Sequence, residues 1–185
     1  MLLFIKMKET IEVKLDIPEG VSVSYENGVV CVKGPLGELK RTLFYPGVDI
    51  KVDDKIVIRS EKATKREKKM IGTFKAHVRN MLKGVTKGHV YKLKVCSGHF
   101  PMSVSVEGDE LVVKNFFGER APRKLKIPSG VKVKVEGNDI VVESVDKELA
   151  GRTASDIEQL TRRVGFDKRI FQDGIYIYYK DGKYV

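Results

Sequence analysis

Hydrophobic and polar positions alternate along three short runs near the start of the chain. These runs are Val21–Tyr25, Val30–Val32 and Val48–Val52. Alternation with a period of two is typical of strands that bury one face and expose Lys, Ser or Asp on the other. Turn signals at Glu26–Gly28 and Gly34–Gly37 separate the runs, as in antiparallel hairpins. The pattern therefore predicts a small antiparallel sheet.

The same order of hydrophobic and polar residues occurs a second time further along the chain. Two pairs of segments match at a constant offset of 81 residues, and two more match at a slightly larger offset. The pairs are Val21–Gly28 with Met102–Asp109, Val30–Glu38 with Leu111–Glu119, Val48–Val52 with Val131–Val135, and Ile56–Ser60 with Ile140–Ser144. Internal similarity of this kind indicates two copies of one structural unit.

After the alternating runs, each copy changes to a helical period. In the first copy, Thr64 and Glu67 have the spacing of a capping box, and Gly84 is the expected C-terminal stop. One helical face then holds Met70, Phe74, Val78 and Met81, with Ile71 and Leu82 beside them. In the second copy, Asp146 is the expected N-cap and Gly165 the expected stop. Its inner face holds Ala150, Ala154, Ile157, Leu160 and Val164.

Each copy is therefore predicted to be an α+β unit: the chain is two tandem copies of a small antiparallel sheet with one helix packed on one face. We place the first unit at residues 1–83 and the second at residues 84–185. The tail segment Ile175–Tyr179 predicts a further strand, added to the second sheet.

The charge of the chain indicates an anionic partner. There are 35 Lys and Arg against 25 Asp and Glu, which gives a net charge of +10. Nucleic acid and an anionic membrane surface are the two candidates. Membrane binding favours a basic amphipathic helix with bulky apolar anchors, whereas both predicted helices use their apolar faces for their own sheets. We therefore expect a nucleic-acid partner and no membrane association.

The N-terminus and the cysteines indicate a cytosolic protein. The apolar run Leu2–Ile5 is far shorter than the ~20 residues that cross a bilayer, and it lacks the basic n-region of a signal peptide. Met7 is an alternative start. Cys31 and Cys96 are then expected to be reduced thiols, and with no Cys or His close to either in sequence we expect no metal site.

No residue pattern in the sequence indicates an enzyme. His77 lies in the middle of the first predicted helix, and His89 and His99 flank a strand without metal-ligand spacing. His99 is the best functional candidate, although a turn-stabilising role is favoured for it. Gly34–Gly37 lacks the Lys-Ser/Thr of a phosphate-binding loop, and Gly84–Gly88 follows a helix instead of preceding one. We expect no catalysis, no cofactor and no small-molecule substrate.

Three segments concentrate the positive charge. Lys62–Lys69 opens the first helix, where cations oppose the helix dipole, so a solvated face and an RNA contact are equally open there. Arg162–Arg169 follows the second helix, where cations suit the dipole. Lys114–Lys126 contains a loop with Phe116 and Phe117.

Within that loop, we expect one phenylalanine to be core, matching Leu36 of the first copy. The other is free to stack on a base or to reach into a groove.

Several ordered motifs match one known family. They are Gly34–Gly37, Gly84–Gly88 followed by Tyr91–Lys94, His99–Pro101, Asp146–Gly151 with Ala154, and Phe171–Ile175. The order and spacing of these motifs, between Glu9 and Lys180, resemble those of one family. This is the family of the universal sixth protein of the large ribosomal subunit, in its archaeal and eukaryotic form. Bacterial and eukaryotic members usually end in a Pro- and Lys-rich segment after the last helix. This chain instead has Val164–Arg169 and Phe171–Gly174 there, as archaeal members do.

The resemblance implies a structural protein of the cytoplasmic ribosome. It implies binding to large-subunit rRNA near the region that binds translation GTPases, with other ribosomal proteins as neighbours and with most rRNA contacts in the second unit. Together with the charge clusters, it gives as candidate rRNA-binding residues Lys114, Arg120, Arg123, Lys124, Lys126, Lys147, Gly151, Arg152, Arg162, Arg163, Lys168 and Arg169. The alternative is a protein-docking module of a ribonucleoprotein whose basic charge is incidental.

Overall fold

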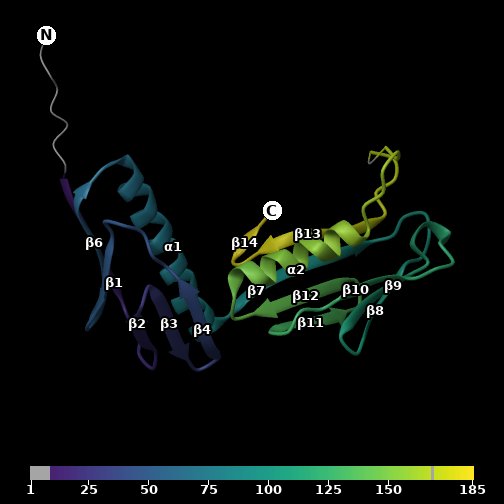
Figure 1. Cartoon of the computed structure of the whole chain (residues 1–185). Coiled ribbons are helices and arrows are strands. Elements are labelled where there is room, and N and C mark those ends of the chain that lie inside the picture. Colours follow the sequence, from purple (N-terminus) through teal and green to yellow (C-terminus); the bar gives the residue numbers. More distant parts are fainter. Residues whose placement is uncertain (1–8, 168) are drawn as a thin grey trace, which may run out of the picture. The chain divides into compact units, whose positions relative to one another are not determined.

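The computed structural model describes residues 9–167 and 169–185, and these residues divide into two compact units between Lys87 and Gly88 (Figure 1). Leu2–Ile5, the alternative start Met7 and Lys168 lie outside the described residues. The division falls after the predicted boundary at Lys83 because the first helix continues through that position. No helix among the described residues is long and apolar enough to cross a membrane.

The first unit packs one helix against two antiparallel sheets (Figure 1). Its strands are β1 (Glu9–Asp16), β2 (Ser22–Glu26), β3 (Val29–Gly34), β4 (Gly37–Thr42), β5 (Asp49–Val52) and β6 (Lys55–Ala63), and its helix is α1 (Lys65–Lys87). The sheets have the orders β1-β6-β5 and β2-β3-β4. Val32 of β3, Ile58 of β6 and Val78 of α1 are fully buried, so the helix closes one core over both sheets.

The second unit repeats this arrangement. Its elements are β7 (His89–Cys96), β8 (Ser103–Glu107), β9 (Glu110–Lys114), the 3-10 turn η1 (Phe116–Gly118), β10 (Arg123–Lys126), β11 (Val131–Glu136), β12 (Asp139–Ser144), α2 (Lys147–Leu160), β13 (Gly174–Lys180) and β14 (Lys183–Tyr184). The sheets have the orders β10-β9-β8 and β11-β12-β7-β13-β14. Strands β7 to β12 thus repeat β1 to β6 in order and pairing, which confirms the duplication and the α+β class.

Two details refine that prediction. The described strands of each unit form two sheets, where the alternation suggested one. The tail strand β13 pairs with β7, as expected, and extends the sheet that lies under α2.

Helix α1 starts where predicted but ends later. The Thr64 amide donates to Glu67 Oε2 at 2.8 Å, and the Thr64 hydroxyl accepts from the Arg66 amide at 3.2 Å, so the first-turn amides are capped. Gly84 is buried inside the helix instead of ending it. The helix stops at Lys87, before Gly88 with φ +73°. Near the end of the helix, the Val85 carbonyl accepts from the Leu36 amide at 3.0 Å. The β3–β4 turn therefore supplies a hydrogen-bond donor to one of the last carbonyls of the helix.

That contact makes Gly34 a position without room for a side chain. A Cβ there would lie 2.7 Å from Val85 Cγ2 and 2.9 Å from the Val85 carbonyl oxygen. We expect Gly34→Ala to destabilise the first unit by about 2 kcal/mol, the typical cost of overpacking, in thermal denaturation followed by circular dichroism. Gly72→Ala is the control, since its Cβ meets nothing within 4 Å and Ala favours a helix. A Gly34→Ala protein as stable as the wild type contradicts the packing described.

Helix α2 ends before the predicted stop. Asp146 caps it by accepting from the Glu148 amide at 2.9 Å, and the inner-face alanines and Ile157 are fully buried as predicted. However, the helix stops at Leu160, and Val164 is 87% exposed. The reason is that Thr161 Oγ1 accepts from the Ile175 amide at 2.9 Å, so the chain turns toward β13 there. The predicted stop, Gly165, lies in the loop that follows.

Candidate nucleic-acid interface

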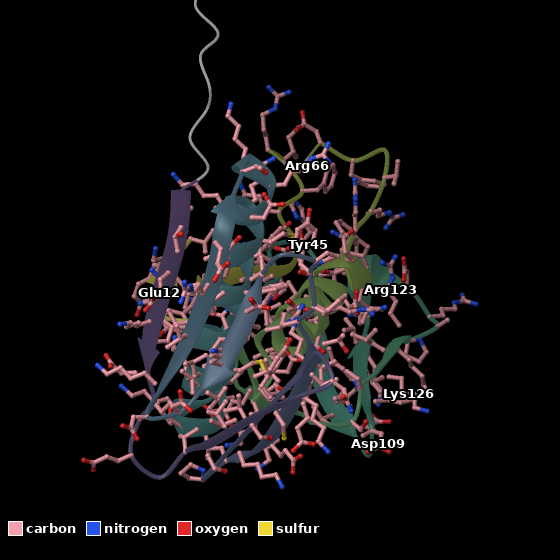
Figure 2. The ribbon with its side chains drawn as sticks, turned by 60° about the vertical axis from the view of Figure 1, so that its left-hand side comes forward. Glu12, Tyr45, Arg66, Asp109, Arg123 and Lys126 are labelled. Carbon is pink, nitrogen blue, oxygen red and sulfur yellow. The ribbon has the colours of Figure 1, made fainter. Side chains whose placement is uncertain are left out.

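Strand β10 divides the predicted basic loop into an inward and an outward set of side chains. Arg123 and Leu125 are half-buried, whereas Lys124 and Lys126 are exposed. Lys124 lies 3.3 Å from Glu110 of β9, and Lys126 has no ion pair with any described residue. Figure 2 shows Arg123 and Lys126 on the same strand, with Asp109 near the Lys126 end. There the Ile127 amide donates to the Asp109 carbonyl at 2.7 Å.

Arg123 is held by contacts within the protein. Its guanidinium donates to both carboxylate oxygens of Glu119, at 2.8 and 2.6 Å, and to the Leu160 carbonyl at 2.7 Å. It also lies 4.4 Å from the centre of the Phe116 ring. The hydrogen bond from Arg123 lowers the pKa of Glu119, against the effect of burial. Arg123 therefore joins the turn after β9 to the C-terminal end of α2, where a cation suits the helix dipole.

An aromatic cluster lies beside the contact between Arg123 and the C-terminal end of α2. Phe116 is 1% exposed and meets Phe117 edge-on at 4.8 Å. Phe117 in turn contacts Phe166 and Phe171, at ring distances of 5.5 and 6.0 Å. Arg163 lies 5.0 Å from the Phe117 ring and 4.2 Å from the Phe166 ring. Phe117, Phe166, Phe171 and Arg163 line part of a hollow of about 370 Å³.

One phenylalanine of the loop is a core residue, as expected, but its suggested counterpart in the first unit is not. Phe116 is the core residue, but Leu36, its suggested counterpart in the first unit, is 53% exposed. Phe117, the candidate for stacking on a base, is half-buried and packs on the aromatic and arginine side chains around it.

Asp173 was not singled out from the sequence, yet it fixes the loop after β7. The carboxylate accepts from the Gly98 amide at 2.7 Å, from the His99 amide at 2.9 Å, and lies 2.6 Å from His99 Nδ1. Although burial raises it, the amide and side-chain hydrogen bonds of His99 lower the pKa of Asp173 to about 2. The His99 ring also packs against Phe171, at 5.1 Å, which agrees with the turn-stabilising role favoured for His99.

The candidate residues in the first part of α2 also have structural partners. Lys147 lies 3.8 Å from Asp181, which also faces the fully buried His89 at 3.0 Å. A Cβ on Gly151 would lie 3.2 Å from the Tyr91 hydroxyl oxygen, so a glycine there suits the close approach of β7. Arg152 is largely exposed, 3.9 Å from Asp156. These residues lie up to ~20 Å from the C-terminal end of the helix.

The other candidates are exposed to different degrees. Lys114 pairs with Glu107 at 2.8 Å, and Arg169 pairs with Asp167 at 2.7 Å while remaining 89% exposed. Arg162 hydrogen-bonds to Gln159 at 3.3 Å. Arg120 is exposed and has no ion pair within the described part of the chain. The fold thus brings together η1, β10 and the end of α2, and leaves Lys147, Gly151 and Arg152 toward the other end of the helix.

Comparison with known proteins gives two kinds of match. The family model described as ribosomal protein L6 matches residues 17–88 and again residues 100–174. The large ribosomal subunit protein uL6 of Methanosarcina mazei is 49% identical over 167 residues, covering 90% of this chain and 95% of the relative. The protein of the same name from Nanoarchaeum equitans is 49% identical over 184 residues, covering 95% and 96% of the two chains.

The duplicated fold, the exposed cations of the second unit and these matches define a structural protein of the ribosome, with no enzymatic role. More narrowly, the chain belongs to the ribosomal protein L6 family, because the family model covers most of it and curated relatives match it over nearly its whole length. It is accordingly a component of the large subunit of the cytoplasmic ribosome. The two family-model matches fall one in each unit, which agrees with the duplication seen in the fold.

Proposed function

We propose that the second unit binds large-subunit rRNA through the exposed cations of β10, of the loop that precedes it and of the segment after α2. The observation that carries this proposal is the exposure of Arg120, in the loop before β10, and of Lys124 and Lys126 on β10; these three residues are here named the β10 surface. Arg and Lys neutralise phosphates and release the condensed counterions, which supplies most of the sequence-independent affinity for RNA. Folded RNA is recognised largely by the shape of its backbone.

The roles of the two sets of basic residues differ in this proposal. Arg123 and Arg163 shape the surface by holding η1 and the end of α2 together. Lys124 keeps only an exposed ion pair with Glu110, and such pairs contribute about 0–1 kcal/mol. A phosphate therefore displaces the carboxylate of Glu110 at low cost, whereas the Arg123 contacts persist in the complex.

We further propose that the bound protein lies near the region of the subunit where translation GTPases bind, beside other ribosomal proteins. The support is the resemblance in the ordered motifs, of which Asp146–Gly151 and Phe171–Ile175 lie in the second unit. In the structure these two segments form the start of α2 and the approach to β13. Both elements belong to the unit that carries the β10 surface.

Removing the β10 surface is expected to weaken rRNA binding and to reduce its salt dependence. In the triple variant Arg120→Ala, Lys124→Ala, Lys126→Ala, each lost phosphate contact lowers the slope of log K against log salt by about 0.7–0.9. The measurement is binding of the full chain to a large-subunit rRNA fragment at several salt concentrations.

The matched control removes three exposed lysines from the sheet face of the same unit that is turned away from α2, in the variant Lys94→Ala, Lys132→Ala, Lys134→Ala. We expect a much smaller change of slope. An equal loss in both variants contradicts the assigned surface, because affinity would then follow total charge alone. Retention of the protein in ribosomal particles after complete RNA digestion favours the protein-docking alternative.

A further inference from the structure

Helix α1 carries far more positive charge than its structural role requires. Its cations are Lys65, Arg66, Lys68, Lys69, Lys75, Arg79, Lys83 and Lys87, and its one acidic residue is Glu67. Helix α2 occupies the equivalent place in the second unit with the cations Lys147 and Arg152 and three acidic residues. Because both helices cover the same kind of sheets, packing does not explain the charge of α1.

The cations of α1 gather on the side opposite its buried face. At 100° per residue, Lys68, Lys75 and Arg79 form one row along the helix. Lys65 and Lys69 belong to a second row, which Lys83 and Lys87 continue. Gly72 lies between the two rows and Ala76 lies within the second row; both are exposed, and a Cβ on Gly72 would meet nothing within 4 Å. The face is therefore positive along both rows, with the small residues Gly72 and Ala76 at its centre.

This arrangement disfavours the isolated helix. Lys68 and Lys69 stand near the positive end of the helix dipole, which disfavours cations. Like charges four residues apart, such as Lys65 with Lys69 and Lys75 with Arg79, cost about 0.2–0.5 kcal/mol per pair. Within residues 9–167 and 169–185, no carboxylate pairs with Lys68, Lys75 or Arg79. An anionic partner outside the chain would make this charge favourable.

We propose that the exposed face of α1 binds the phosphate backbone of double-stranded RNA, as a second RNA contact separate from the β10 surface. The helix is ~34 Å long, so its cations reach several successive phosphates. A membrane partner fits less well because such helices insert bulky apolar side chains, whereas Gly72 and Ala76 occupy the centre of this face. The shallow, small-residue centre admits close approach of an RNA backbone.

The test uses the full chain and the variant Lys68→Ala, Lys75→Ala, Arg79→Ala. Since Ala favours helix formation, circular dichroism should show unchanged or greater helicity. Binding to a large-subunit rRNA duplex fragment should fall about tenfold at moderate salt, with a salt slope lower by about 2. The matched control is Lys33→Ala, Lys40→Ala, Lys55→Ala, which removes three cations of the same unit that already pair with Glu38 or Asp16. We expect less than a threefold loss from it.

The outcomes separate this inference from the proposed function. Loss of duplex binding in both the α1 and the β10 variants, with a greater loss when the two are combined, supports two RNA contacts. A wild-type slope in the α1 variant overturns the inference, and leaves the β10 surface standing if the β10 variant still loses affinity. The inference is also overturned if the α1 variant loses binding to anionic lipid vesicles, or to an acidic polypeptide, while duplex RNA binding is unchanged.

Discussion

Replacing Arg123 with alanine is expected to destabilise the second unit by about 3 kcal/mol. The substitution removes the paired hydrogen bonds to Glu119, the cap on the Leu160 carbonyl and the stacking on Phe116. Hydrogen bonds to charged groups contribute about 1.5–3 kcal/mol, and the half-buried Glu119 carboxylate would lose its partner. We expect the amides of α2 to exchange with solvent faster, because the helix end is no longer held.

Hydrogen exchange followed by mass spectrometry suits this prediction because it reports on each unit separately. The control is Lys126→Ala on the same strand, where the side chain is exposed and has no ion pair with a described residue. Its effect is expected to stay within about 0.5 kcal/mol. If Arg123→Ala is as mild as Lys126→Ala, Arg123 does not have the structural role described, and it returns to the set of candidate RNA contacts.

Removing the carboxylate of Asp173 is expected to have an effect of similar size. Asp173→Ala leaves the amides of Gly98 and His99 and the His99 ring without their acceptor. Each buried unsatisfied donor costs about 1–3 kcal/mol, but water can reach the exposed loop, so we expect about 3 kcal/mol in total. The measurement is chemical denaturation of the full chain, and a loss below about 1 kcal/mol contradicts the role assigned to Asp173.

The same residue gives a dependence on pH. The pKa of Asp173 is about 2 in the folded protein, against an ordinary value of 3.8. Folding therefore favours the ionised carboxylate, and its contribution is fully present above about pH 5 and is lost as the pH falls toward 2. This difference corresponds to about 2 kcal/mol. In Asp173→Asn, stability should fall less between pH 5 and pH 2 than in the wild type; parallel pH curves contradict this assignment.

Local patterns in the sequence were sufficient to predict most elements of the fold. The offset of 81 residues matched β2 and β3 with β8 and β9, and Thr64 and Asp146 marked the helix starts. Strand β1 was missed, although Ile11, Val13 and Leu15 alternate with polar residues as in the other strands. It lies outside the segments that match in sequence between the two copies.

The candidate site was less predictable because its contacts join distant parts of the chain. Arg123 and Leu160 are 37 residues apart, and His99 and Asp173 are 74 apart. Residue type and spacing identify a basic cluster, but they do not show which cations already have a partner in the folded protein. The fold separates Arg123, which holds the structure together, from Arg120 and Lys126, which are exposed and have no ion pair with a described residue.

The proposed contact with large-subunit rRNA is tested most directly by a crosslinking map of the protein within intact large subunits. Crosslinked peptides are identified by mass spectrometry, and the rRNA nucleotides by reverse transcription. We predict RNA crosslinks to peptides that contain Arg120, Lys124 and Lys126, at nucleotides near the region that binds translation GTPases. Crosslinks from the second unit that are confined to other proteins, with none to rRNA from these peptides, would contradict the account.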